Sequence, residues 1–348
     1  MTLNMIPHNK ELAQLPEYID EIKRLDLDAL IISDPGVFSM VKEEMPEMEI
    51  HISTQANNVN WASALFWAEQ GADRIILARE LGRDEIKEIT EKTAGKIELE
   101  YFVHGAMCIS YSGRCLLSNY FVGRDANKGD CAQSCRWKYH LVEEQRPGEY
   151  YPIEENEQGT FIMNSKDLNL AEEIPELIEM GLSSLKIEGR MKSVHYAASV
   201  INTYRQLIDQ YYEDPENYKA DPELLDELKK ISHRDYTKGF YYGKPGAEGQ
   251  RYETSSYIRT YDFMGVVKDY SAKKEEALVE VRNKIFVGDE LEFIVPGQKT
   301  FTTTVDYIIN DQGEKIEAAP HPKQLIKIPL SSEVPAGSLL RRQKQDNN

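Results

Sequence analysis

The chain has 348 residues, which is enough for one large domain and a smaller one, or for two to three domains of average size. Its 59 acidic residues outnumber its 41 basic ones, and the formal net charge of -18 argues against a surface coated with basic groups for duplex nucleic acid or anionic lipid. No run approaches the roughly 20 apolar residues of a membrane span, and the start of the chain lacks the features of a secretory signal, so we expect a cytoplasmic protein with no membrane partner.

From residue 1 to about 213, short β-rich runs alternate with amphipathic helical stretches, which predicts repeated βα units. No G-x-G-x-x-G or P-loop motif follows a strand, so the pattern favours an α/β fold with a TIM-like (β/α) barrel over a doubly wound nucleotide-binding sheet. Because a closed barrel has eight strands and fewer are visible, we expect the barrel to be incomplete at its N-terminus. The expected strands are residues 2–6, 29–33, 50–54, 74–78, 97–103, 161–164 and 185–188, and the expected helices are residues 10–24, 58–70, 167–180 and 193–212.

The repeat is interrupted at about residues 104–159, which we interpret as a cysteine-bearing insertion after the fifth strand, at the end of the strands where barrels place their chemistry. Toward the C-terminus, short alternating strands separated by turns predict a small antiparallel β-barrel domain. The expected domains are the (β/α) barrel at residues 1–213, a polar connector at 214–257, the β-barrel domain at 258–341 and a tail at 342–348.

All four cysteines lie close together in the sequence, with the spacing C-x6-C-x15-C-x3-C. In a reducing compartment such clustering indicates metal or redox chemistry rather than disulfides. Four thiolates suit a tetrahedral zinc site or an iron–sulfur cluster, and the absence of a C-x2-C knuckle favours the 4Fe-4S cluster. The alternative is four separate buried cysteines that act as small apolar residues. The expected metal ligands are Cys108, Cys115, Cys131 and Cys135.

The sequence EYFVHGAMCISYSGRCLLS at residues 100–118 resembles the signature of the collagenase-like peptidase family U32. The resemblance continues through SKDL at 165–168, KIEGRMK at 186–192 and SSYIR at 255–259, and so it covers nearly the whole chain. The C-terminal β domain and the segment GFYYGKP at 239–245 are most similar to the branch of tRNA hydroxylation proteins.

That resemblance implies an RNA-modifying enzyme that hydroxylates the wobble uridine of tRNA at C5 without molecular oxygen. It implies prephenate as co-substrate and hydroxyl source, and a 4Fe-4S cluster on the four cysteines, with zinc as the alternative. The implied partners are tRNA and a paralogous subunit of the same family. Full-length relatives begin with two further βα units, whose Leu-x-Ala-Pro-Ala-Gly strand this chain lacks.

Polar side chains stand at the expected strand ends, where the loops of a barrel converge. Arg79, Arg190 and Lys192 are candidates to bind a dicarboxylate, because a guanidinium holds a carboxylate through two parallel hydrogen bonds. Glu188 is a candidate acid or base, or a residue that orients Arg190. For each residue alone, an ordinary salt bridge or helix cap is an equally good explanation. The expected catalytic residues are Glu188, Arg190 and His104, and the expected substrate-binding residues are Arg79, Gln55, Asn57, Lys166, Lys186 and Lys192.

The family's peptidase label leaves a second class of function open. The chain contains no H-E-x-x-H, no G-x-S-x-G and no aspartic-protease motif. A cysteine protease needs a free thiolate beside a histidine, and His104 is the nearby candidate for Cys108, but this use would break the set of four ligands. The alternatives are therefore a collagenase-like peptidase and a non-catalytic subunit of a paralogous hydroxylase complex.

Two regions are candidates to contact RNA. Small β-barrels often bind RNA, so by analogy the C-terminal domain is expected to hold the tRNA arm. Basic residues that flank the cysteine region are also expected to form a local phosphate-binding patch despite the acidic total; they are Lys128, Arg136, Lys138, Arg190 and Lys192.

Overall fold

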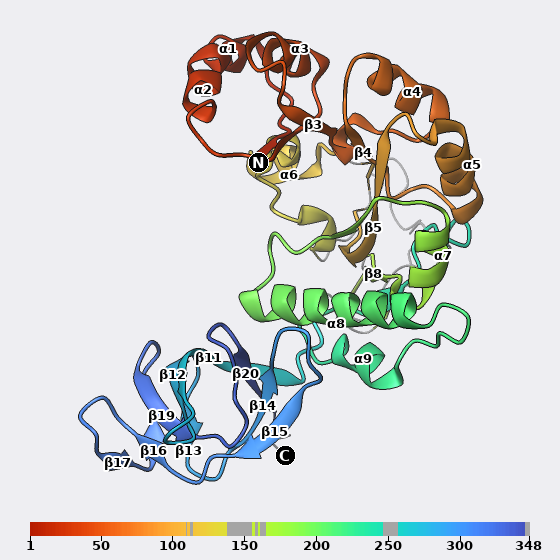
Figure 1. Cartoon of the computed structure of the whole chain (residues 1–348). Helices are drawn as coiled ribbons and strands as arrows, with labels where there is room; N and C mark the ends of the chain where they lie inside the picture. The colour runs from red at the N-terminus through yellow and green to blue at the C-terminus, as the bar shows by residue number, and fades with distance from the viewer. Residues whose placement is uncertain are drawn as a thin grey trace. The chain divides into compact units, whose positions relative to one another are not determined.

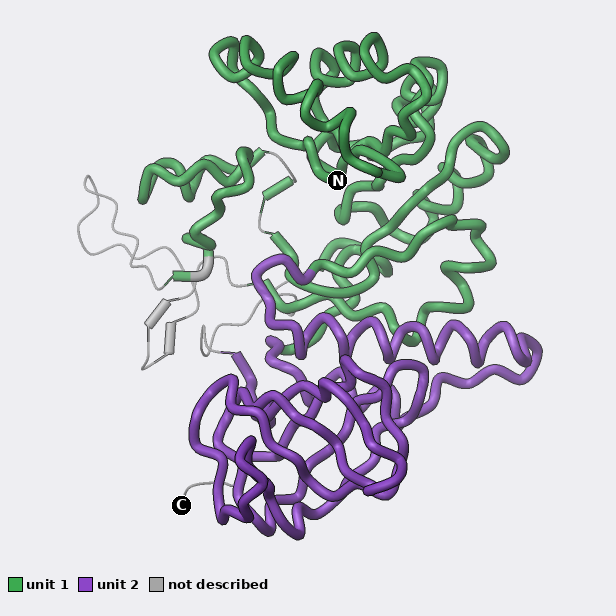
Figure 2. The backbone as a smooth tube through the Cα atoms, turned by 60° about the vertical axis from the view of Figure 1, so that its left-hand side comes forward, with its two compact units in different colours: residues 1–188, 235–256 green, residues 189–234, 257–348 purple. Residues whose placement is uncertain are grey.

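The computed structural model describes residues 1–108, 110–111, 114–137, 155–156, 159–160, 165–245 and 257–344. The chain forms two compact units, one made of residues 1–188 and 235–256 and the other of residues 189–234 and 257–348 (Figure 2). Each unit has its own sheet and its own buried apolar side chains.

The first unit is built on a largely parallel sheet. Strands β1 to β5 pair in chain order, each parallel to the next, and β9 pairs in parallel with the other side of β5. Apolar side chains of the central strands are buried at 0–1% exposure, namely Leu30, Ile32, Ile50, Ile52, Ile75 and Ile76, and they form the core of this unit. The strands are β1 (Thr2–Leu3), β2 (Ala29–Ile32), β3 (Glu49–Ile52), β4 (Arg74–Ile76), β5 (Glu98–Ala106) and β9 (Ser184–Ile187).

The carboxyl end of β5 has a further neighbour. It pairs antiparallel with β8 (Asp167–Asn169), which in turn pairs in parallel with β10 (Tyr236–Thr237). Among the strands of the described residues no pairing joins β1 to β9 or β10. The first unit is therefore a mixed α/β structure with a parallel sheet, and a closed TIM-like barrel is not confirmed.

Helices α1 to α5 of the first unit connect successive parallel strands, whereas α6 and α7 lie in the segments before and after β8 (Figure 1). Side-chain caps begin two of them: Asp34 accepts hydrogen bonds from the backbone of Gly36 and Val37, and Asn60 accepts one from Ser63. The helices in the described part are α1 (Asn9–Leu12), α2 (Leu15–Ile22), α3 (Pro35–Glu44), α4 (Trp61–Glu69), α5 (Arg83–Thr93), α6 (Leu117–Val122) and α7 (Ile174–Glu179), with 3-10 turns η1 (Thr54–Ala56), η2 (Ala126–Lys128), η3 (Ser134–Arg136) and η4 (Ala171–Glu173).

The helix expected over residues 167–180 is wrong at its start. Asp167 is fully buried in β8, and its backbone N–H donates to the carbonyl oxygen of Asp235 at 2.9 Å instead of beginning a helix. The helical part is shorter and consists of η4 and α7. The strand expected at residues 161–164 lies outside the described residues.

The second unit contains a curled antiparallel sheet, which forms a half-barrel with the order β15-β14-β20-β11-β12-β19-β16-β17. Its inward side chains, among them Val279, Phe293 and Ile328, form one continuous apolar core. The antiparallel C-terminal domain expected from the sequence is confirmed in this coarser form. The elements are α8 (Val194–Glu213), α9 (Pro222–Glu227), β11 (Tyr261–Ser271), β12 (Glu276–Val281), β14 (Glu290–Ile294), β15 (Phe301–Thr304), β16 (Ile308–Ile309), β17 (Lys315–Ile316), β19 (Leu325–Pro329) and β20 (Leu339–Gln343), with the separate pair β13 (Ile285–Phe286) and β18 (Ala318–Ala319).

Buried charges join the helices of the second unit to its sheet. The Arg341 side chain on β20 is fully buried and donates to Glu292 on β14 at 2.6 and 2.8 Å and to Glu227 at the end of α9 at 2.6 Å. Strand β20 also includes Arg342 and Gln343 of the segment expected as a tail. In the part of the chain that the structure describes, no helix has both the length and the apolar character needed to cross a bilayer.

Candidate active site

The carboxyl ends of parallel strands β3, β4, β5 and β9 are the expected position for chemistry in a sheet of this kind. Arg79, which follows β4, connects two of these ends. Its Nη1 donates to the carbonyl oxygen of Ala106 at the end of β5 at 2.6 Å, and its guanidinium carbon lies 5.0 Å from the centroid of the Phe102 ring. A cation–π contact and a hydrogen bond therefore hold Arg79 against β5.

Lys186 on β9 approaches the same ring. Its Nζ lies 5.6 Å from the Phe102 centroid and 2.5 Å from a carboxylate oxygen of the buried Glu100. Burial alone would raise the pKa of Glu100, but the Lys186 ammonium, with help from Arg74, holds this pKa below its usual range. The expected substrate-binding residue Lys186 thus takes part in an ion pair within the sheet.

The expected catalytic residues His104 and Glu188 lie on neighbouring strand ends. The backbone N–H of Glu188 donates to the carbonyl oxygen of His104 at 2.8 Å. Gly105 has a φ of +118°, and a Cβ at this position would lie only 2.3 Å from the carbonyl oxygen of Glu188. The His104 side chain is buried, with its ring 5.3 Å from the ring of Tyr236. The glycine therefore permits the close approach of β5 to the residue that follows β9.

Glu80 is a site residue to which sequence reasoning assigned no role. Within the described residues its buried Oε2 atom has no hydrogen-bond partner. Burial raises the pKa of Glu80. Its own backbone N–H and the charge of Arg79 lower this pKa, but burial has the larger effect. Burial also raises the pKa of Tyr101, and the Glu80 carboxylate adds to this rise, which places the two side chains in one electrostatic environment. An Arg-Glu pair after a strand is common, so the sequence carries no signal of this burial.

The cysteine-bearing segment is tied to the end of β3. Asn127 donates through Nδ2 to the carbonyl oxygen of Cys115 at 3.1 Å and accepts from the backbone N–H of Cys115 at 3.4 Å. Gln55 donates to the carbonyl oxygen of Asn127 at 3.2 Å. Asn57, at a left-handed φ of 55°, donates to the carbonyl oxygen of Gln55 at 3.3 Å. The expected substrate-binding residues Gln55 and Asn57 thus position the segment that carries the cysteines.

The four cysteines are half-buried, and no disulfide joins them. Cys108 follows β5, Cys115 precedes α6, and Cys135 lies in η3, which packs against α6. The backbone N–H of Gln133 donates to Sγ of Cys131 at 3.3 Å. Among the described residues no three Cys, His, Asp or Glu side chains are gathered as a metal site. The segment thus supplies a donor set of the right chemistry without assembling it.

The remaining expected site residues have separate surroundings. Lys166 is half-buried beside β8, and Arg190 is exposed. Lys192 donates to the carbonyl oxygen of Ser232 at 3.3 Å, with its Nζ 4.2 Å from the centroid of the Tyr257 ring. Arg190 and Lys192 belong to the second unit, whereas the other expected site residues belong to the first.

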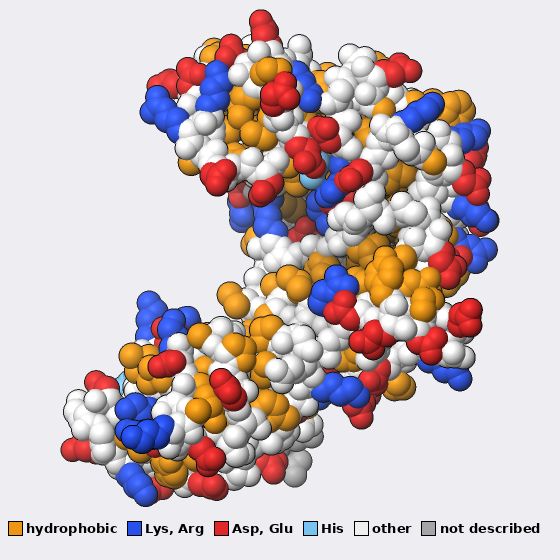
Figure 3. All heavy atoms as spheres, in the orientation of Figure 1, with side chains coloured by type: hydrophobic (Ala, Val, Ile, Leu, Met, Phe, Trp, Pro, Cys, Tyr) orange, Lys and Arg blue, Asp and Glu red, His pale blue; other side chains and the backbone are white. Residues whose placement is uncertain are grey.

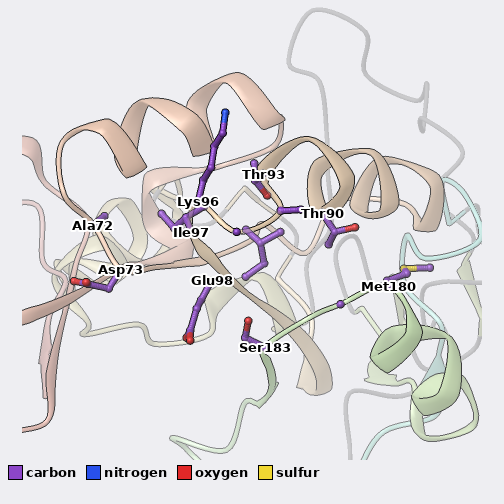
Figure 4. A pocket seen from close by; sticks show the side chains of 13 residues that line it. Ala72, Asp73, Thr90, Thr93, Lys96, Ile97, Glu98, Met180 and Ser183 are labelled. Atoms are coloured by element: carbon purple, nitrogen blue, oxygen red, sulfur yellow. The ribbon is translucent and has the colours of Figure 1, made fainter.

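A pocket of about 580 Å³ lies at the opposite ends of the same strands (Figure 4). Asp73, Glu98 and Ser183 line it where β4, β5 and β9 begin. Barrel-like folds place their chemistry at the carboxyl ends of the strands, so we do not assign the active site to this pocket.

Two family models match the chain. The model described as "Peptidase family U32" matches residues 1–251, and the model described as "Peptidase family U32 C-terminal domain" matches residues 259–341. Together they span both compact units.

Curated relatives match along most of the chain. "tRNA hydroxylation protein P1" of Bacillus subtilis strain 168 is 41% identical over 99% of this chain and 81% of its own length, and "tRNA hydroxylation protein P" of Escherichia coli strain K12 is 37% identical over 96% and 81%. The "23S rRNA 5-hydroxycytidine C2501 synthase" of Escherichia coli strain K12 is 31% identical over 85% of this chain and 44% of its own length.

Proposed function

Because this chain belongs to peptidase family U32, we propose that it is an RNA-modifying enzyme that hydroxylates tRNA. The observation that carries this proposal is the extent of similarity to relatives named as tRNA hydroxylation proteins, which match 99% and 96% of the chain. The similarity to an rRNA hydroxycytidine synthase supports base hydroxylation as the reaction class.

The proposed reaction replaces the C5–H bond of the wobble uridine by C5–OH. This change is a two-electron oxidation of the base, so it requires an oxygen source and an electron acceptor. Prephenate is the proposed co-substrate that supplies the hydroxyl group, while the C5 proton passes to a base and the two electrons pass to an external electron acceptor. Arg79 is the proposed ligand for one of its carboxylates, because a guanidinium binds a carboxylate through two parallel hydrogen bonds and the contacts to Ala106 and Phe102 hold Arg79 in place.

A 4Fe-4S cluster on Cys108, Cys115, Cys131 and Cys135 is part of the proposal, and it would supply redox or Lewis-acid chemistry when bound. Two hydrogen bonds support this assignment. Asn127 fixes the main chain at Cys115, and the backbone N–H of Gln133 donates to the sulfur of Cys131. Protein purified under argon should contain iron and acid-labile sulfide. A colourless protein with stoichiometric zinc would refute the cluster.

Proton transfer in this proposal belongs to the strand ends of the first unit. Glu188 is the proposed acid or base, and His104 lies beside it through the backbone bond between β5 and the end of β9. Arg190, Lys166, Lys186 and Lys192 are proposed to add positive charge for the anionic substrates. We also propose that the barrel closes as in a TIM barrel and that the chain works with a paralogous subunit. If the chain is such a subunit, the two proteins together should restore an activity that neither has alone.

The experiment that tests the function is deletion of the gene followed by mass spectrometry of the nucleosides of bulk tRNA. We expect the loss of 5-hydroxyuridine and its derivatives, restored by the wild-type gene but not by Cys108→Ala. Restoration by Tyr212→Ala, an exposed change on α8, provides the control. Unchanged 5-hydroxyuridine in the deletion strain would refute the proposal, and the loss of protein cleavage instead would identify a peptidase.

A further inference from the structure

Large apolar side chains are exposed around the cysteines of the first unit. Tyr120 on α6 is 82% exposed and Leu116 is 72% exposed, while Ser118 is the buried residue of this short helix. An exposed apolar cluster on a protein surface marks a site for a ligand or partner. We name this surface the α6 patch, and it consists of Tyr111, Leu116, Tyr120, Phe121, Val122 and Trp137.

Three aromatic rings of the α6 patch form a continuous row. The rings of Tyr120 and Phe121 are 5.3 Å apart in an edge-to-face arrangement, and the rings of Phe121 and Trp137 are 6.5 Å apart. The row runs from α6 to the residue that follows η3. Exposed aromatic rings are platforms on which unstacked nucleic-acid bases stack.

The charge around the row favours a polyanion. Residues 111–137 contain four basic residues, Arg114, Arg124, Lys128 and Arg136, and two acidic ones, Asp125 and Asp130, so the segment has a net charge of 4 − 2 = +2 in a chain of net charge -18. Arg124 pairs with Asp130 and Lys128 with Glu11, whereas Arg114 is exposed and has no ion pair among the described residues.

On the face shown in Figure 3, Lys and Arg side chains are scattered among Asp and Glu. A protein partner would cover an apolar surface without needing this local excess of positive charge. Phosphate groups need it, because basic side chains supply most of the affinity for a nucleic-acid backbone.

We infer that the α6 patch binds a single-stranded loop of RNA, with bases stacked on Tyr120, Phe121 and Trp137 and a phosphate beside Arg114. The inference rests on the proposed function and deepens it. It assigns RNA contact to the segment that carries the cysteines, in addition to the C-terminal β domain expected from the sequence. A base that leaves its stack would thus be held close to the main chain that carries Cys115.

The test uses the full chain and a fluorescent tRNA anticodon stem-loop, with affinity measured by anisotropy at one fixed salt concentration. Tyr120→Ala should weaken binding roughly tenfold or more, because a stacking platform is lost. Tyr120→Phe should retain wild-type affinity, since the ring remains. The matched control Tyr212→Ala removes a tyrosine that is 64% exposed on α8 of the second unit and should leave affinity unchanged.

Four results would overturn the inference. Two concern Tyr120: wild-type affinity of Tyr120→Ala for the RNA, and an equal loss of affinity in Tyr120→Ala and Tyr212→Ala. The third is wild-type affinity of a second variant, Phe121→Ala. The fourth is a loss of self-association in Tyr120→Ala at unchanged RNA affinity, because that result would identify a protein contact. Unchanged thermal melting of each variant shows that it folds. Failure of the proposed function would give a different result from failure of this inference. If the proposed function is wrong, the tRNA of the deletion strain keeps 5-hydroxyuridine, whatever the affinity of the α6 patch for RNA.

Discussion

Gly105 and Glu188 approach each other more closely than any other residue type at position 105 would allow. A Cβ on Gly105 would lie 2.3 Å from the carbonyl oxygen of Glu188 and 2.8 Å from its Cβ, and the φ of +118° at Gly105 is one that L residues rarely adopt. The spacing between the ends of β5 and β9, where we place the chemistry, therefore depends on the absence of a side chain.

Gly105→Ala should separate these strand ends. Backbone atoms block the new methyl group, so we expect a loss of at least about 1–3 kcal/mol in the free energy of unfolding, together with the loss of tRNA hydroxylation. Urea unfolding measures the first effect. Gly189→Ala is the control, because its Cβ would meet Tyr196 at 3.5 Å, an ordinary contact distance, and its cost should be below that of Gly105→Ala. Equal costs would contradict the role of Gly105.

Glu80→Gln should change how stability depends on pH. Burial raises the pKa of Glu80 above its ordinary value of 4.5, so the folded state favours the protonated carboxyl. The wild-type protein should therefore lose stability as pH rises from about 4.5 through the raised pKa, and Glu80→Gln should lack this loss. Urea unfolding at pH 5 and pH 8 should show a relative gain for the variant at pH 8. The control Glu91→Gln, an exposed change on α5, should show no such gain. If Glu80→Gln and the wild type differ in free energy of unfolding by the same amount at pH 5 and pH 8, the interpretation is refuted.

His195 should make the second unit sensitive to acid. Burial lowers the pKa of His195 to about 4, Arg341 acts in the same direction, and Glu227 and Glu292 oppose it. The unfolded state gains its proton near pH 6.5 and the folded state near pH 4, so stability is complete above pH 6.5 and falls by roughly 3 kcal/mol toward pH 4.

His195→Phe keeps a ring against Phe263, on which His195 stacks at 5.7 Å, but removes the titration. Its free energy of unfolding should therefore fall less than that of the wild type between pH 6.5 and pH 4. Parallel pH profiles of the two proteins would show that His195 is not the source of the acid sensitivity.

Arg341→Met should strongly destabilise the second unit. The change removes the buried guanidinium that Glu227 and Glu292 share and leaves them only the partly exposed Lys230, at 2.9 and 3.3 Å. Breaking a buried ion pair costs roughly 3–5 kcal/mol. Adding Glu292→Gln to Arg341→Met should recover part of this loss. Arg205→Ala breaks an exposed pair with Asp209 on α8 and should cost below about 1 kcal/mol. Similar costs for the buried and the exposed pair would contradict this prediction.

Much of the parallel sheet was predictable because its strands are continuous apolar runs. The expected strands at residues 29–33 and 50–54 correspond to β2 (Ala29–Ile32) and β3 (Glu49–Ile52). The strand β8 was missed, since a run as short as Asp167–Asn169 becomes a strand only through pairing with β5 and β10. The burial of Glu80 was likewise not predictable, because its sequence neighbours do not reveal which side of a strand end faces the interior.

The sequence by itself determined the family, the cysteine spacing and the change from βα repeats to antiparallel strands, because motifs and periodicity are properties of neighbouring residues. Only the tertiary structure decided that Gly105 lies against Glu188, that Arg341 joins α9 to the half-barrel, and that the rings of α6 face solvent. The reason is physical: close approach, burial and charge pairing depend on segments far apart in the chain, and no local pattern encodes which of them meet.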